Sequence, residues 1–184
     1  MASQAGARVA WLRRLGVVAA VACVAASPAA AGDYRGQIRA LMPTPKEFGF
    51  TQLLAFKPAK KPAAALRKGW KGGVAAIYAK GTRKAPVEAA ATVYVYAKPA
   101  DAKNASRHAC ANCPHTVANG IQMRYAATKS NGTVTVQTFM VCRNVYANAV
   151  TTGAEPATEL ARDAGALGLA VLNRAVHFGM TACR

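Results

Sequence analysis

The stretch from Gly120 to Thr151, GIQMRYAATKSNGTVTVQTFMVCRNVYANAVT, decides the fold. It contains three runs rich in β-branched and aromatic residues, at 120–127, 133–141 and 145–151. Ser130-Asn131-Gly132 is a strong hairpin signal, because Asn and Gly accept the backbone angles of a tight turn. A second turn or a bulge is expected at 142–144. Strands joined by such short turns run antiparallel, so this stretch predicts three antiparallel strands.

Two more strands are expected upstream, over 74–79 and 87–97, because both runs are rich in strand-forming residues. Helices are expected at three places that a proline can open: 62–68, 99–109 and about 156–178. The last helix has an apolar side that should face the sheet: Leu160, Ala164, Leu167, Val171, Ala175 and Phe178. The predicted fold class is α+β, an antiparallel sheet of about five strands with two or three helices packed on it and stabilised by disulfides.

Residues 1–31 have the pattern of a secretory signal peptide. Three arginines (Arg8, Arg13 and Arg14) precede an apolar run over 15–26, and small residues follow as far as Ala31. We expect cleavage after Ala31, which makes the protein secreted or extracytoplasmic. An N-terminal membrane anchor and lipidation at Cys23 are the alternatives.

Residues 32–184 should form a single α+β domain, because 153 residues suit one domain with a full core. No segment of this mature chain has the roughly 18 consecutive apolar residues of a transmembrane helix, so no membrane span is expected in it.

Four cysteines follow residue 31: Cys110, Cys113, Cys142 and Cys183. An even number of cysteines in an oxidising compartment predicts two disulfides, and the sequence leaves all three connectivities open. A zinc site built from these cysteines, with or without His108 or His115, is an alternative. Its spacing lacks a second Cys-x-x-Cys, so no metal is expected.

The segment Cys110-Ala-Asn-Cys113-Pro-His115 also raises the possibility of redox chemistry. Covalent haem attachment needs a histidine directly after the second cysteine, and Pro114 occupies that position. In a thioredoxin-like centre the pair opens a helix, whose dipole lowers the pKa of the first thiol. Here the pair follows the helix expected over 99–109. A structural disulfide is therefore favoured, and a thiol–disulfide oxidoreductase remains an alternative function.

Other catalytic signals are absent from the sequence. It has no nucleophile elbow, phosphate-binding loop, dinucleotide-binding fingerprint or zinc-protease motif. No catalytic residue and no cofactor are expected, and the protein is not expected to be an enzyme.

The charge is strongly basic, with 24 Lys and Arg against seven Asp and Glu and a formal net charge of +17. Loss of residues 1–31 would remove three arginines and leave +14. An anion-binding surface is expected from eight cations: Lys57, Lys60, Lys61, Arg67, Lys68, Lys71, Arg83 and Lys84. The segment 57–62 is interrupted by prolines and is expected to be an exposed loop. A surface that merely keeps the protein soluble is the alternative.

Three features resemble a known group of proteins: Trp70-Lys71-Gly72-Gly73 before a strand, the entry from strand to helix at 97–102, and the paired cysteines with one at the tail. They resemble the small secreted α+β domains of actinobacteria, namely sensor-like extracellular domains of receptor kinases and related envelope lipoproteins. The resemblance covers about residues 70–184, and photosystem-P-like domains share it to the same extent. It implies a non-catalytic binding or sensing module and transfers no functional residue.

The sequence thus predicts a secreted, non-catalytic binding or sensing module at the cell envelope with a strongly basic surface. Its partner is expected to be an anionic envelope component, either lipid head groups or phosphate polymers. A nucleic-acid partner is not expected, because an exported protein leaves the compartment that holds the nucleic acids. A cationic protein that binds envelope polyanions without a smaller ligand is the second alternative. The sequence makes no prediction of the oligomeric state.

Overall fold

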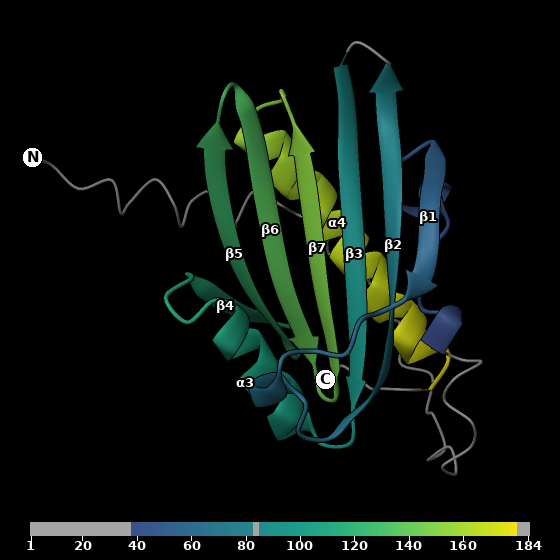
Figure 1. Cartoon of the computed structure of the whole chain (residues 1–184), viewed down its shortest axis with the longest axis vertical. Coiled ribbons are helices and arrows are strands. Elements are labelled where there is room, and N and C mark those ends of the chain that lie inside the picture. The colour runs from purple at the N-terminus through teal and green to yellow at the C-terminus, as the bar shows by residue number, and fades with distance from the viewer. Residues whose placement is uncertain (1–37, 83–84, 180–184) are drawn as a thin grey trace, which may run out of the picture.

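The computed structural model describes residues 38–82 and 85–179, and these form one antiparallel sheet with helices on both faces (Figure 1). Seven strands make up the sheet: β1 Gln52–Pro58, β2 Trp70–Thr82, β3 Ala85–Tyr96, β4 His115–Ala118, β5 Ile121–Ser130, β6 Thr133–Cys142 and β7 Val145–Gly153. Their spatial order is β1-β2-β3-β7-β6-β5-β4. The helices are α3 Pro99–Ala109 and α4 Ala157–His177, and two short 3₁₀ turns are η1 Pro45–Phe48 and η2 Ala64–Leu66. The predicted α+β class is confirmed.

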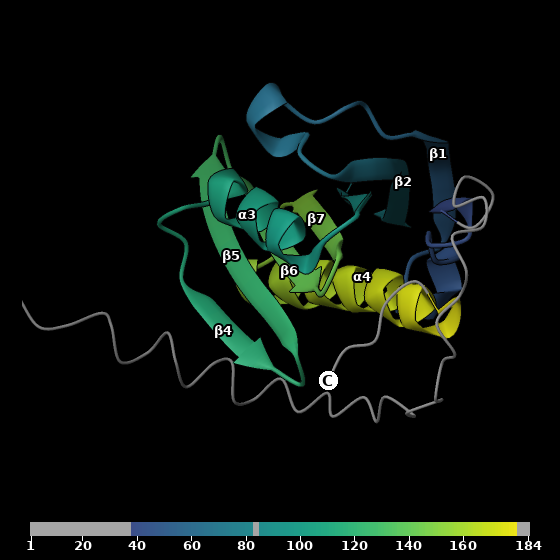
Figure 2. The same cartoon turned by 90° about the horizontal axis from the view of Figure 1, so that it is seen from below.

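Helices α3 and α4 lie on opposite faces of the sheet (Figure 2). Successive residues of a strand point to opposite faces. Val93 and Val95 of β3 therefore belong to the main core on the α4 side, whereas Tyr94 and Tyr96 pack in a smaller cluster with α3. This smaller cluster also contains Tyr146, whose ring stacks on Tyr94 at 5.9 Å between centroids. Both faces of the central strands are thus packed at the end that α3 covers.

Helix α4 crosses β6, β7 and β3 and contacts η1. Five of the six side chains predicted to face the sheet are fully buried: Leu160, Ala164, Leu167, Val171 and Ala175. The prediction for Phe178 is wrong. The helix ends at His177, and Phe178 is its C-cap residue and is 37% exposed.

Two threonine hydroxyls of the sheet donate hydrogen bonds to backbone carbonyls of α4. Thr138 of β6 donates to the carbonyl of Ala164 at 3.2 Å, and Thr151 of β7 donates to that of Leu160 at 2.6 Å. Both threonines are buried, so these bonds satisfy polar groups inside the core.

The predicted hairpin at Ser130-Asn131-Gly132 is confirmed. Asn131 and Gly132 both have positive φ, 48° and 76°, the backbone geometry that matches the twist of two neighbouring strands. The turn between β6 and β7 likewise places Arg143 at a φ of 47°. The three strands of residues 120–151 therefore lie in the order that the sequence predicts.

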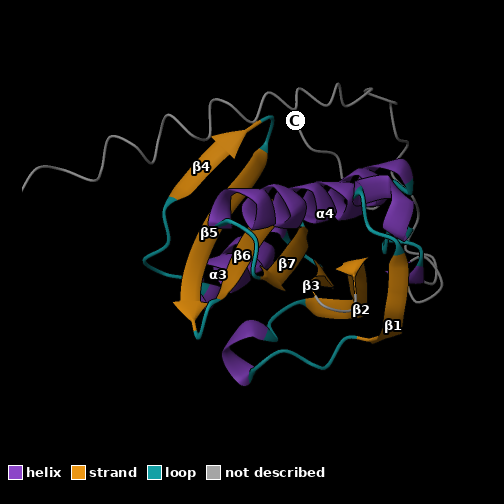
Figure 3. Ribbon diagram, turned by 90° about the horizontal axis from the view of Figure 1, so that it is seen from above, coloured by secondary structure: helices purple, strands orange, loops and turns teal. Residues whose placement is uncertain are grey.

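The prediction of about five strands is corrected to seven, because β1 and β4 were missed. They form the two edges of the sheet (Figure 3). Six of the seven residues of β1 are exposed, and β4 has only four residues. Neither strand has the alternation of buried and exposed residues by which a strand is recognised, so only their pairing with β2 and β5 defines them.

The helix predicted over 62–68 is also wrong. This segment contains only the 3₁₀ turn η2, and Arg67 closes it by donating from Nε to the carbonyl of Pro62 at 3.0 Å. Leu66 packs against the cluster around α3. The loop is therefore held by one side-chain hydrogen bond and one apolar contact rather than by helical periodicity.

Candidate anion-binding site

A pocket of about 620 Å³ lies where β1 ends and β2 begins. Ten residues line it: Ile38, Arg39, Pro58, Ala59, Lys61, Trp70, Lys71, Gly72, Gly73 and Val74. They come from the segment before η1, the end of β1, the loop after it and the start of β2. The volume lies within the range of small-molecule sites, about 300–1,000 Å³.

Three of the lining residues are cationic: Arg39, Lys61 and Lys71. All three are exposed, whereas Ile38 and Val74 are buried at 4% and 1% exposure. The cations are therefore accessible at the mouth of the pocket. The apolar lining residues that reach the surface are Pro58, which is exposed, and Ala59 and Trp70, which are half-buried. None of the described residues that line it carries a carboxylate. Like charges held at one mouth attract an anion, because each of them lowers the potential energy of a negative group placed there.

Gly72 and Gly73 bring the backbone of β2 close to its neighbours at the pocket. A Cβ on Gly72 would lie 2.7 Å from Cδ1 of Ile38, and a Cβ on Gly73 would lie 2.5 Å from the carbonyl oxygen of Val93. The register of β2 with β3 also shifts between Trp70 and Gly72. The glycines therefore permit the irregular start of β2 and leave backbone, rather than side chains, on this part of the wall.

Trp70 supplies the aromatic part of the wall. Its indole Nε1 is buried and has no hydrogen-bond partner among the described residues. Burying an indole N–H without an acceptor costs free energy. The Trp70 side chain also packs against the smaller cluster around α3.

Arg39 joins the pocket to β1. Its guanidinium carbon lies 5.9 Å from the centre of the Phe56 ring, within the range of a cation–π contact. Phe56 itself is 38% exposed, and Leu53 and Leu54 of the same strand are 49% and 52% exposed. An apolar strip therefore runs along β1 toward Pro58, which lines the pocket.

The structure brings two of the eight predicted anion-binding residues, Lys61 and Lys71, to this pocket. The other predicted cations in the described residues are exposed but do not line it: Lys57, Lys60, Arg67 and Lys68. Arg83 and Lys84 lie outside the described residues. The expected exposed loop over 57–62 needs correction, because Lys57 and Pro58 are the last two residues of β1 and Pro62 is buried.

Arg39 was missed by the sequence analysis. It lies in a segment without a periodic pattern, before Pro43. Arg39 lies near Lys61 and Lys71 because the segment before η1 packs against β2 through Ile38. A charge count cannot show such a contact between segments.

Several carboxylates are engaged elsewhere. Lys80 lies 2.6 Å from Oδ2 of Asp163 and 3.9 Å from Oε2 of Glu155. The Arg174 guanidinium donates to both carboxylate oxygens of Glu47 and, through Nη1, to the carbonyl of Ala40 at 2.9 Å. The hydrogen bond from Arg174 lowers the pKa of Glu47 to about 2. These acids stabilise the packing of α4, and they do not neutralise the mouth of the pocket.

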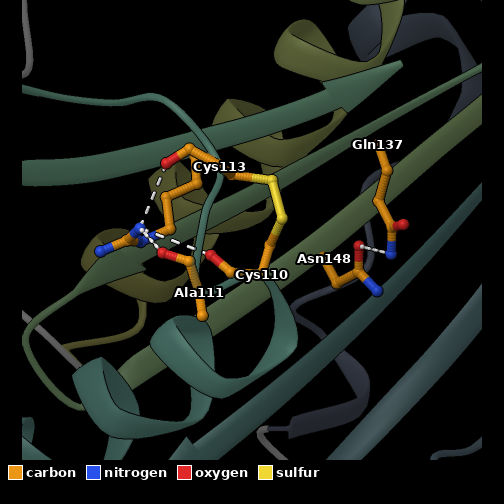
Figure 4. Close-up of a disulfide and its surroundings, with 6 residues drawn as sticks. Cys110, Ala111, Cys113, Gln137 and Asn148 are labelled. Carbon is orange, nitrogen blue, oxygen red and sulfur yellow. Dashed lines mark hydrogen bonds between the residues drawn. A yellow bond between two sulfur atoms is a disulfide. The ribbon is translucent and has the colours of Figure 1, made fainter. Parts of the chain in front are cut away.

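Cys110 and Cys113 are joined by a disulfide (Figure 4). Cys110 is the C-cap residue of α3, so the pair follows the helix, as the sequence predicted. Nη1 of Arg124 lies within hydrogen-bonding distance of three carbonyls of this loop, those of Cys110, Ala111 and Cys113, at 3.3–3.5 Å. A buried guanidinium therefore anchors the Cys-x-x-Cys loop to β5.

Cys142 is also disulfide-bonded, and Cys23 and Cys183 lie outside the described residues. Within residues 38–82 and 85–179 no three His, Cys, Asp or Glu side chains gather as metal ligands would. No helix in the same ranges combines the length and the apolar character needed to cross a membrane.

Comparison with known proteins gives a sparse result. No protein-family model matches the chain, and no curated protein is similar to it in sequence. One solved structure with some likeness is the extracellular domain of PknH from Mycobacterium tuberculosis. The identity is 14% and the TM-score 0.45, over 80% of this chain and 98% of that one.

Proposed function

We propose that this chain is an extracytoplasmic, non-catalytic binding module that holds a phosphate-bearing component of the cell envelope. The pocket of Arg39, Lys61 and Lys71 is the proposed site. The observation that carries the proposal is the meeting of three exposed cations, from three separate segments, around one pocket whose described lining residues include no acid.

The disulfide between Cys110 and Cys113 supports the compartment. Disulfides persist in oxidising environments and are rare in the cytosol. The pattern of residues 1–31 points the same way. The position of Cys110 after α3 supports a structural disulfide, because the negative end of the helix dipole does not stabilise a thiolate.

The charge of the mature chain supports an anionic partner. A large positive field raises the local concentration of anions and speeds their encounter with the protein. Since salt screens such a field over about 8–10 Å at physiological ionic strength, binding that depends on it should weaken as salt rises.

Two phosphate sources have the same chemistry, lipid head groups and wall polymers, and binding assays can separate them. The assays are co-sedimentation with phosphatidylglycerol vesicles and fluorescence anisotropy with labelled polyphosphate. Phosphatidylcholine vesicles serve as the neutral control. We expect binding to at least one anionic probe, weaker binding at high salt, and no binding to phosphatidylcholine. No binding to either anionic probe at low salt would overturn the proposal.

A matched pair of variants tests whether the pocket is the site. Lys61→Ala with Lys71→Ala removes two pocket cations, whereas Lys103→Ala with Lys129→Ala removes two exposed cations elsewhere. Both variants lose the same charge. We expect the pocket pair to weaken binding about tenfold, equivalent to about 1.4 kcal/mol, and the control pair to weaken it much less.

A second candidate function is non-specific binding of polyanions. It is favoured by the four cations of the Lys57–Lys71 segment that are exposed but lie outside the pocket. In that case the two pairs of variants would weaken binding equally, because only the total charge would matter.

A further inference from the structure

We propose that the ligand of this pocket is an anionic amphiphile, in which a phosphate or carboxylate head group is joined to a single apolar chain. The inference rests on the proposed function and specifies its ligand class. It depends on three properties of the pocket: the combination of cations and apolar surface in its wall, the hydrogen-bonding chemistry of its side chains, and the apolar strip beside it.

The wall of the pocket is both charged and apolar. Arg39, Lys61 and Lys71 are exposed, and among the apolar lining residues Pro58 is exposed while Ala59 and Trp70 are half-buried. A ligand in this pocket therefore has cations and apolar surface within reach. An inorganic anion would leave that apolar surface in contact with water, whereas an apolar chain would remove it from water at a gain of about 25 cal/mol per Å².

The side chains that line the pocket can donate hydrogen bonds but cannot accept them. The exposed polar ones are Arg39, Lys61 and Lys71, and all three are donors only. A sugar or a nucleobase carries N–H or O–H groups that need acceptors. A phosphate or carboxylate carries acceptors only, so its chemistry complements these side chains.

The apolar strip on β1 continues the same surface. Phe56 lies beneath Arg39, Leu54 is half exposed, and Pro58 ends the strand in the pocket wall. A chain too long for the pocket could lie along this strip, which would cover one side of the chain and leave the other side in water. The neighbouring Lys57 and Lys60 are cationic, so they would favour a ligand with an anionic head group over one with a neutral head group.

Ligand binding can be followed through the fluorescence of Trp70. Trp11 belongs to the predicted signal peptide, so Trp70 is the single tryptophan of the chain after residue 31. Because Trp70 lines the pocket, its fluorescence should respond to a ligand bound there. The probes are dodecyl phosphate, dodecyl maltoside and inorganic phosphate, each added to the secreted chain below the concentration at which micelles form.

We expect dodecyl phosphate to change the Trp70 emission with saturation at one ligand per protein. Dodecyl maltoside should have no saturable effect, because its head group is neutral. Inorganic phosphate should bind much more weakly. In the series octyl, decyl and dodecyl phosphate, each buried methylene should strengthen binding about threefold to fourfold until the apolar wall is covered.

Two variants test the two halves of the site. Lys61→Ala with Lys71→Ala should weaken dodecyl phosphate binding about tenfold. Ala59→Phe places a ring in the pocket and should weaken dodecyl phosphate more than polyphosphate. The pair Lys103→Ala and Lys129→Ala is the matched control, and thermal unfolding checks that each variant is folded.

Three results would overturn the inference. The first is equal affinity for inorganic and dodecyl phosphate. The second is equal affinity for dodecyl phosphate and dodecyl maltoside, and the third is the absence of any saturable change at Trp70. If polyphosphate or vesicle binding still depends on Lys61 and Lys71, the proposed function survives and only the amphiphile fails. If that dependence is lost as well, both fail.

Discussion

At the scale of single residues, Arg124 shows how one buried cation can organise a loop. Its Nη1 faces three carbonyls of the loop that Cys110 and Cys113 close, and the side chain is only 7% exposed. Ala111 and Cys113 lie beyond the end of α3, so Arg124 offers a side-chain donor to carbonyls outside the helical hydrogen-bond pattern.

The first prediction concerns this contact. Arg124→Met should lower the free energy of unfolding by about 1–3 kcal/mol, because it removes the side-chain donor from the loop carbonyls, of which the bond to Cys113 is buried. Urea unfolding monitored by circular dichroism measures the change. The variant should also speed reduction of the Cys110–Cys113 disulfide by dithiothreitol. Arg107→Met, which removes an exposed arginine of α3, is the control and should do neither.

The second prediction concerns Glu47, whose pKa falls from 4.5 to about 2 because Arg174 hydrogen-bonds to its carboxylate. The folded-state pKa is below the unfolded one, so the ion pair contributes its full stability above about pH 4.5. This contribution disappears as the pH falls toward 2. The difference in unfolding free energy between the parent and Glu47→Gln should therefore be constant near neutral pH and shrink between about pH 4.5 and 2. A difference that does not change over this range would contradict the assignment.

At the scale of elements, two glycines one turn apart in α4 have different surroundings. A Cβ on Gly165 would meet nothing within 4 Å, whereas a Cβ on Gly168 would lie 2.7 Å from the sulfur of Met140. Gly168 therefore allows α4 to approach β6 closely, and Gly165 has no such role.

The third prediction uses these glycines as a matched pair. Gly165→Ala should stabilise the protein by about 0.5–1 kcal/mol, because alanine loses less conformational freedom in a helix. Gly168→Ala should lack this gain or destabilise by up to about 1–3 kcal/mol, since Met140 must move. Thermal unfolding of both variants measures the difference, and equal stabilisation would show that α4 does not pack closely on β6.

The elements also show what the sequence could predict. Helix α3 begins and ends at the predicted residues, because Pro99 fixes its start and Pro114 follows its end. The hairpin at Asn131-Gly132 was equally clear. The edge strands β1 and β4 were missed because exposed strands need no alternation of apolar and polar residues, and the turn η2 is held by Arg67 and Leu66 through contacts that periodicity does not report.

At the scale of the whole molecule, only part of the candidate site could be predicted. Charge alone identified Lys61 and Lys71, but it also selected Lys57, Lys60, Arg67 and Lys68, which do not line the pocket. Choosing between them requires the path of the chain around the start of β2. The same path brings Arg39 to the mouth of the pocket.

The net charge and the pocket make different demands on a ligand. A net charge acts on any anion at long range and is screened by salt. The proposed site combines cations with apolar side chains, so it should select a ligand that matches both. We therefore expect salt to reduce the rate of encounter strongly, while the choice among anions depends on the apolar side chains.

The proposed pocket is tested most directly by a map of amide and indole chemical shifts of residues 32–184 during titration with soluble, short-chain phosphatidylglycerol. Trp70 gives a single indole resonance, because it is the only tryptophan after residue 31. We expect this resonance and the amides of Gly72 and Gly73 to shift together and saturate. Shifts scattered over Lys103, Lys129 and the other exposed cations, with the Trp70 indole unmoved, would contradict it.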